Sequence, residues 1–242
     1  MGMPELLIQI KAAATTAISR SGRGVVALVL KDDTSQTDTF VYAKMTSVAK
    51  SHWTTANLDY IQKTFDGSPA RVIVERISAT NGDLTEALAR LKTKKWNYIA
   101  VPGATSDEIT ELTTWIKNNR ASGKTFKAVL PNTAADNEGI VNFATDDILV
   151  GKKTYSTEEY CCRIAGILAG TDLDNSATYT VLSEVSGITE STDPDTDVEN
   201  GKLILINDGE HIKLGRAVNS LKTIGTNKTA DMKKIKIMDG LD

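Results

Sequence analysis

Few side chains in this sequence could do covalent chemistry. It has two histidines, His52 and His211, and two adjacent cysteines, Cys161 and Cys162. A nucleophilic triad needs a histidine beside a serine or cysteine, and a zinc site needs spaced Cys and His ligands. His52 stands in the polar segment K-S-H-W and His211 on a predicted strand, so we interpret both as structural or solvated. We interpret the cysteines as a buried pair in a reducing compartment and expect no catalytic residue.

The most enzyme-like feature is the segment Gly103 to Ser106, which links a predicted strand to a predicted helix. A strand that leads into a helix N-terminus can hold an anion on free backbone N–H groups. We expect Ser106 to be the N-cap of that helix, with Asp107 and Glu108 in its first turn. The sequence has no G-x-x-x-x-G-K-[ST] motif, and Gly22-Arg23-Gly24 precedes the first strand, whereas a Rossmann glycine loop follows it. A small-molecule or nucleotide-binding α/β enzyme is therefore one alternative hypothesis, and a generic adaptor domain is another.

The bulk composition argues against several classes of partner. The chain has 242 residues, 40% of them hydrophobic and 24% charged, with a net charge of -3 and a pI of about 5.5. This balance is typical of a globular domain and argues against general binding to nucleic acid or to anionic membranes. The longest apolar runs, such as Gly24 to Leu30, are much shorter than the ~20 residues that a membrane helix needs. We expect no cofactor, no metal, no nucleic-acid partner and no membrane partner.

Alternating strand and helix patterns predict the scaffold. Continuous β-branched runs indicate strands, and apolar residues at helical spacing indicate helices, with short turns between them. This alternation predicts an α/β fold with a mixed, largely parallel central sheet flanked by helices. We expect strands at Gly24 to Lys31, Thr39 to Ala43 (an edge strand), Ala70 to Ile77, Trp96 to Val101 and Phe126 to Leu130, and helices at Thr55 to Phe65, Leu84 to Leu91, Ser106 to Gly123 and from Thr157 to the Ala169-Gly170-Thr171 stop.

A β-hairpin dominates the C-terminal part of the chain. Leu203 to Ile206 is an unbroken apolar run, of the kind that a strand carries when both of its faces are covered. Asp208-Gly209 supplies a tight turn, and the second strand runs from Glu210 to Arg216. Before the hairpin we expect short strands at Gly139 to Ala144 and Asp147 to Val150, an extended segment at Thr178 to Leu182, and an exposed acidic loop at Ser186 to Asn200 that could hold a helical turn.

Six collinear segments together resemble the tail sheath proteins of contractile-tailed phages. The likeness is to the short sheath proteins of Gram-positive phages, defective prophages and phage-tail-like bacteriocins, and it covers essentially the whole chain. That family's core is subtilisin-like, but the protease signatures D-T-G, H-G-T and G-T-S-M-A are absent here, so the likeness to subtilisin is one of topology. The six segments are P-E-L-L-I-Q-I-K at 4–11, R-S-G-R-G-V-V-A-L-V-L-K-D-D at 20–33, V-L-P-N-T-A-A-D-N-E-G-I-V-N-F at 129–143, D-I-L-V-G-K-K-T-Y-S at 147–156, L-I-L-I-N-D-G at 203–209 and R-A-V-N-S-L at 216–221.

The resemblance implies a structural subunit that uses no cofactor. Family members polymerise as stacked hexameric rings around a tail tube, and they contract when the baseplate fires, which drives the tube through the host envelope. The implied partners are other sheath subunits, the tail tube protein, and the baseplate and tail terminator proteins. The implied location is the tail of a virion or of a phage-tail-like particle, assembled in the bacterial host cytoplasm.

The resemblance also implies a division of the chain. We expect an N-terminal arm at 1–22, a sheath core at 23–228, and at 229–242 the start of a connection to a C-terminal domain that family members carry and this chain lacks. In the family, terminal arms join neighbouring subunits by β-strand addition. That implies an arm strand at Leu6, Leu7, Ile8, Gln9 and Ile10, tethered by Thr15 to Gly22. Because the partners of the arm would be absent, we expect this chain alone to be a monomer or a weak oligomer.

Overall fold

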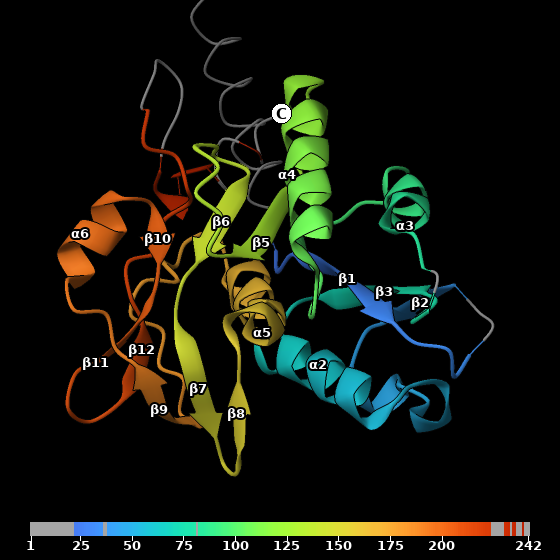
Figure 1. The fold of residues 1–242 in the computed structure, drawn as a ribbon, viewed down its shortest axis with the longest axis horizontal. Coiled ribbons are helices and arrows are strands. Elements are labelled where there is room, and N and C mark those ends of the chain that lie inside the picture. Colours follow the sequence, from blue (N-terminus) through green and yellow to red (C-terminus); the bar gives the residue numbers. More distant parts are fainter. Residues whose placement is uncertain are drawn as a thin grey trace, which may run out of the picture.

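A seven-stranded sheet, in the order β10-β6-β5-β4-β1-β3-β2, runs through the molecule (Figure 1). The computed structural model describes residues 22–35, 38–80, 82–223, 230–232, 234–235 and 239. All neighbouring strands are parallel except β2, which is antiparallel to β3, so the predicted mixed and largely parallel sheet is confirmed. The strands are β1 (Val25–Lys31), β2 (Thr39–Tyr42), β3 (Arg71–Ile77), β4 (Tyr98–Ala100), β5 (Lys127–Pro131), β6 (Ile140–Phe143) and β10 (Lys202–Leu203).

The central strands are continuous apolar runs because helices cover both faces of the sheet. In β1, the residues from Val26 to Leu30 are at most 1% exposed. Val26, Leu28 and Leu30 pack into one core, and Ala27 and Val29 pack into the core on the other face. A strand with this pattern has no polar face, which is what the sequence shows.

Two pairs of helices form the outer layers. The helices α2 (Thr55–Asp66) and α5 (Thr157–Gly170) share one core with the sheet, and α3 (Leu84–Leu91) and α4 (Ser106–Ala121) share the other. Each helix begins after a polar side chain that accepts a hydrogen bond from a first-turn N–H group, as helix N-termini require. These N-caps are Thr54, Asp83, Thr105 and Ser156.

Glycine allows α2 and α5 to approach each other closely. A Cβ atom added at Gly166 would lie 2.2 Å from the carbonyl oxygen of Thr64, and one added at Gly170 would lie 1.8 Å from that of Gly67. Both distances are far inside van der Waals contact. The interhelical distance therefore depends on the absence of side chains at these two positions of α5.

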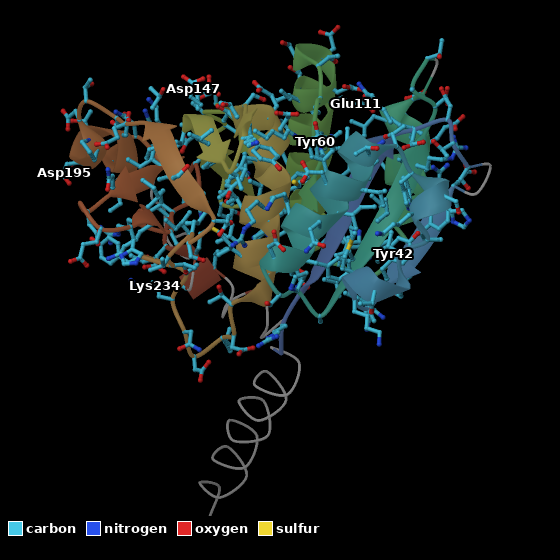
Figure 2. All side chains as sticks on the ribbon, turned by 90° about the horizontal axis from the view of Figure 1, so that it is seen from below. Tyr42, Tyr60, Glu111, Asp147, Asp195 and Lys234 are labelled. Atoms are coloured by element: carbon cyan, nitrogen blue, oxygen red, sulfur yellow. The ribbon has the colours of Figure 1, made fainter. Side chains whose placement is uncertain are left out.

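Two small sheets lie beyond β6, at the opposite side of the molecule from β2 (Figure 1). In one, β7 (Asp146–Val150) pairs with β8 (Lys153–Tyr155) and β9 (Val185–Thr189), and in the other β11 (Leu205–Asn207) pairs with β12 (Ile212–Leu214). The short helix α6 (Pro194–Glu199) lies on this side, so Asp195 and Tyr42 mark opposite ends of the molecule (Figure 2). Two 3-10 turns, η1 (Met45–Ser47) and η2 (Lys50–His52), connect β2 to α2.

The predicted C-terminal hairpin is present, but its first strand is divided between two sheets. Lys202–Leu203 extends the large sheet beside β6, whereas Leu205–Asn207 pairs with β12. Ile204 lies between them, and its carbonyl oxygen accepts a hydrogen bond from Gly215 at 2.8 Å. Residues 203–205 are all apolar because they are buried in the large sheet, in the small sheet and at the residue between them. The prediction of a single strand at 203–206 was therefore wrong.

Three further elements of the C-terminal half differ from what the sequence predicted. The helical turn allowed for within residues 186–200 is present as the helix α6, but the loop predicted before it is wrong, because most of β9 lies there. Residues 178–182 form a turn with one isolated bridge, Val181 to Lys213, and Tyr179 in it has a positive φ of 62°. The strand β8 was not predicted at all, because three residues leave too little pattern to read.

Candidate functional surfaces

The carboxyl ends of β1 and β4 form the usual ligand crevice of an open α/β sheet, because the chain leaves β1 toward β2 and β3 on one side and leaves β4 toward β5 on the other. Asp32 follows β1 and is 1% exposed. Its carboxylate accepts hydrogen bonds from the N–H groups of Thr34 and Thr54, both at 2.8 Å, and from the side-chain amide of Asn57 at 2.7 Å. Burial raises the pKa of Asp32, but these hydrogen bonds outweigh burial and lower the pKa to about 2. The carboxylate therefore has a structural role, because its hydrogen bonds join the end of β1 to the start of α2.

The N-terminus of α4 contains its own negative charge. The N-cap is Thr105, so the prediction of Ser106 was wrong by one residue: Thr105 and Glu108 have the spacing of a capping box. The Glu108 carboxylate accepts a hydrogen bond from the Thr105 N–H at 2.7 Å. It also forms an ion pair with Lys31 on β1 at 2.8 Å. Burial raises the pKa of Glu108, but Lys31 and Thr105 outweigh burial and lower it. The chain thus supplies its own anion at the segment 103–106, which weakens the hypothesis of a ligand site there.

The structure does not bring the potentially reactive side chains together. Cys161 and Cys162 are buried in α5, as predicted, and burial raises the pKa of Cys162 to about 12. His52 lies against the ring of Phe40, with 5.4 Å between the ring centres, and His211 is on the β11–β12 hairpin. Across the described ranges, no group of three His, Cys, Asp or Glu side chains could hold a metal ion, and no helix is long and apolar enough to cross a membrane.

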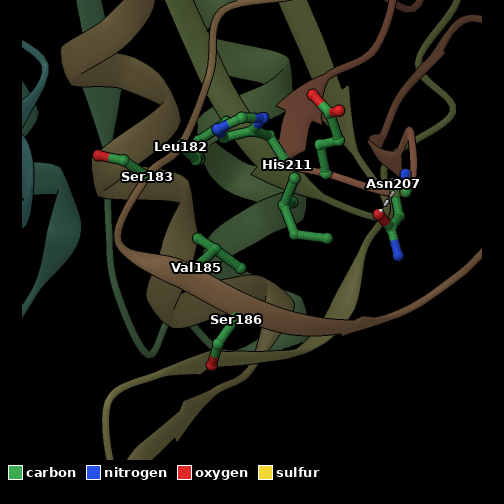
Figure 3. Close-up of a pocket in the computed structure, with 9 residues that line it drawn as sticks. Leu182, Ser183, Val185, Ser186, Asn207 and His211 are labelled. Carbon is green, nitrogen blue, oxygen red and sulfur yellow. Dashed lines mark hydrogen bonds between the residues drawn. The ribbon is translucent and has the colours of Figure 1, made fainter.

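A cavity of about 300 Å³ lies beside the β11–β12 hairpin (Figure 3). His211 and two serines are among its lining residues, which is the composition of a nucleophilic site. However, the hydroxyl of Ser186 donates to the Leu149 carbonyl at 3.3 Å, and no hydrogen bond among the described residues joins it or Ser183 to the His211 imidazole. The cavity therefore offers no activated nucleophile. Its lining is Leu182, Ser183, Val185, Ser186, Asn207, Gly209, Glu210, His211 and Ile212.

The two ends of the chain carry the remaining predictions. The predicted arm strand, Leu6 to Ile10, lies outside the described residues. In the C-terminal segment, Met232 and Ile235 are 3% and 2% exposed. The Asp239 carboxylate forms ion pairs with Lys127, the first residue of β5, and with Arg120 in the last turn of α4. Burial lowers the pKa of Lys127, and Asp239 opposes that shift. The described part of 229–242 therefore packs against the core.

Comparison with known proteins identifies the family. Residues 78–220 match the family described as the phage tail sheath protein central domain. The tail sheath protein of Clostridium phage phiCD119 is 34% identical over 254 aligned positions, which cover all of this chain and 69% of that protein. This alignment includes all six segments that carry the resemblance to tail sheath proteins, and it confirms that resemblance.

Solved sheath structures share the fold. The sheath tail protein of Desulfitobacterium hafniense superposes with a TM-score of 0.81 at 14% identity, covering 90% of this chain and 77% of the other. The helical sheath of the anti-feeding prophage in its contracted state gives a TM-score of 0.67 at 11% identity, covering 91% and 68%. At these identities the structures establish the fold, and the match to the central-domain family together with the Clostridium phage relative establishes the family. The chain belongs to the phage tail sheath protein family, and it is a structural component of a contractile tail.

Proposed function

We propose that this chain polymerises as stacked hexameric rings around a tail tube, and that contraction of the polymer drives the tube through the host envelope. The observation that carries the proposal is the similarity to a phage tail sheath protein over the entire chain. The anti-feeding prophage sheath, which has the same fold, is a helical assembly solved in a contracted state. The proposed partners are other sheath subunits, the tube protein, and the baseplate and terminator proteins, in a particle assembled in the host cytoplasm.

The core has the construction of a body that moves as a unit. Subunits that slide past one another must not deform, and a close-packed core with charged ties between its layers resists deformation. Asp59 on α2 accepts hydrogen bonds from Tyr155 at 2.7 Å and Lys153 at 2.9 Å, which ties β8 to the helix layer. Arg163 on α5 pairs with Glu184 at 2.6 Å, which ties the start of β9 to the same layer. The small sheets are therefore joined to the large one through α2 and α5.

For the ends of the chain we propose the division into an arm at 1–22, a core at 23–228 and a connection at 229–242. In this proposal Leu6 to Ile10 adds a strand to the sheet edge of a neighbouring subunit. Strand addition uses backbone N–H groups, which proline lacks. We expect Ile8→Pro to abolish assembly of the chain into tail particles, and the same change in the tether, Ala17→Pro, to leave that assembly intact. Equal assembly of the two variants, judged by sedimentation and electron microscopy, would rule out strand addition by this segment.

Nucleotide binding is the competing hypothesis, and it is tested by thermal unfolding. A ligand at 100 times its Kd adds about 2.7 kcal/mol of stability. Because the Glu108 carboxylate lies at the N-terminus of α4, we expect ATP and GTP to leave the melting temperature unchanged. A rise in melting temperature with either nucleotide, lost in a Ser106→Pro variant, would support the enzyme hypothesis instead.

A further inference from the structure

The layer formed by α3 and α4 separates negative from positive charge along its length. In both helices and their flanking residues, every acidic side chain precedes every basic one. The two helices run in the same direction, because each connects one parallel strand to the next, and the Thr85 hydroxyl of α3 donates to Glu111 of α4 at 2.9 Å. The layer therefore has one acidic end and one basic end. The charges are Asp83, Glu86, Arg90, Lys92, Lys94 and Lys95 around α3, and Asp107, Glu108, Glu111, Lys117, Arg120 and Lys124 around α4.

Some of these charges are used inside the molecule. Arg90 and Lys94 pair with the fully buried Glu75, at 2.7 and 2.5 Å, and Arg120 and Glu108 also have ion-pair partners. Three acidic and three basic side chains are exposed, and within the described part of the chain none of them forms an ion pair. The acidic end consists of Asp83, Glu86 and Asp107, and the basic end consists of Lys92, Lys95 and Lys124.

Helix dipoles explain only part of this arrangement. Acidic residues in a first turn and basic residues in a last turn favour helix formation, but the effect falls off within that turn. It accounts for Asp83, Glu86 and Asp107. Lys95 and Lys124 lie beyond the last residues of α3 and α4, and the exposed Arg71 at the same edge of the sheet starts a strand. The basic end is therefore larger than helix stability requires.

We propose that the basic end of one subunit binds the acidic end of the next, head to tail. The two ends are equal in exposed charge and lie at opposite ends of one layer, so a translation along the helices brings them together. A head-to-tail contact between different surfaces of identical subunits builds an open stack, and not a two-fold dimer, when a translation relates each subunit to the next. The exposed large hydrophobic side chains of the described residues are Val41, Tyr179 and Val181, all outside this layer, which favours contact through its ends over contact through its side. The inference rests on the proposed function, because it names the surfaces by which stacked subunits meet.

Disulfide trapping tests the head-to-tail geometry. Ser106 and Ser122 are exposed at the acidic and basic ends of α4, and the native cysteines are buried. The two serines are about 24 Å apart along the helix, too far for a disulfide within one molecule. With both changed to Cys, mild oxidation should give a ladder of dimers, trimers and longer species, and either single variant should give no ladder. The Ser122→Cys, Ser186→Cys pair is the control. No ladder, or dimers alone, would overturn the proposal, because dimers alone indicate a two-fold contact.

Charge reversal in the trapping background tests the chemistry of the contact. Glu86→Lys with Asp107→Lys, and separately Lys95→Glu with Lys124→Glu, should each reduce the ladder by about tenfold or more, since like charges then face each other. An equimolar mixture of the two variants should form mixed species again. The matched controls are Asp195→Lys with Glu199→Lys and Lys44→Glu with Lys50→Glu, which change the net charge equally at other surfaces.

Two outcomes separate this inference from the proposed function. A ladder that is insensitive to reversal at both ends would overturn the charge contact, even if the chain is found in tail sheaths. A ladder that responds as expected, for a chain that is never found in tail particles, would support the contact and contradict the sheath function.

Discussion

The carboxylate of Asp32 accepts hydrogen bonds from both the backbone N–H and the hydroxyl of Thr54, at 2.8 and 3.0 Å. Thr54 is the N-cap of α2, so this one side chain joins the end of β1 to the start of the helix. We expect Asp32→Ala to destabilise the fold by about 2–4 kcal/mol, because it leaves buried donors without a partner. The measurement is urea unfolding at neutral pH. The exposed Asp195→Asn on α6 should change stability by less than about 0.5 kcal/mol.

The same carboxylate makes stability depend on pH in the acid range. Folding lowers the pKa of Asp32 from 3.8 to about 2, so its contribution is complete well above pH 3.8 and is lost as the pH falls through about 2. The contribution is about 2 kcal/mol. The difference in unfolding free energy between the wild type and Asp32→Asn should therefore shrink between pH 5 and pH 2. A difference that stays constant over that range would mean that the Asp32 pKa is not lowered.

The close contact of α2 and α5 predicts a steric effect. In Gly166→Ala the new methyl group would overlap the Thr64 carbonyl oxygen, so the helices must separate. We expect a loss of about 1–3 kcal/mol in unfolding free energy, the usual cost of overpacking. Gly187→Ala on β9 is the matched control, because its nearest neighbour would lie at 3.6 Å. Equal stability of the two variants would show that the α2–α5 distance is not limiting.

The adjacent cysteines should be unreactive in the folded protein. Both are at most 1% exposed, and burial raises the pKa of Cys162 to about 12, so hardly any thiolate is present at pH 8. A thiol reagent should modify neither residue before unfolding and both residues after it, at the rate of global unfolding. Rapid modification of one thiol under native conditions would place that residue at an accessible surface instead.

Periodicity was a reliable guide where strands are long and covered on both faces. Val25 to Leu30 is a continuous apolar run, and Val72 to Val74 is the apolar centre of Arg71–Ile77; the prediction of both strands was correct to within a residue. It was a poor guide where strands are short and half exposed. The strand β9 contains Ser186 and Gly187 and precedes an acidic helix, so its composition is that of a loop, and its pairing with β7 is a non-local contact.

The candidate functional surfaces could not be fully predicted, because they depend on contacts between residues far apart in the sequence. The sequence showed a helix start near Ser106. It did not show that the Glu108 carboxylate occupies the anion position at that start and pairs with Lys31, which is 77 residues before Glu108. The capping-box spacing of Thr105 and Glu108 was the one signal that could have placed the N-cap correctly. The segregation of charge along α3 and α4 is visible in the sequence, but its meaning needs the parallel arrangement of the two helices.

Cryo-electron microscopy of tail particles from cells that express the tagged chain is the most direct test of the proposed function. The expected result is density with the present seven-stranded core, repeated six times per ring around a central tube. The chain alone, at the same concentration, should be a monomer or a weak oligomer. Particles whose sheath lacks the tagged chain, although the chain is folded and abundant in the same cells, would contradict a sheath function.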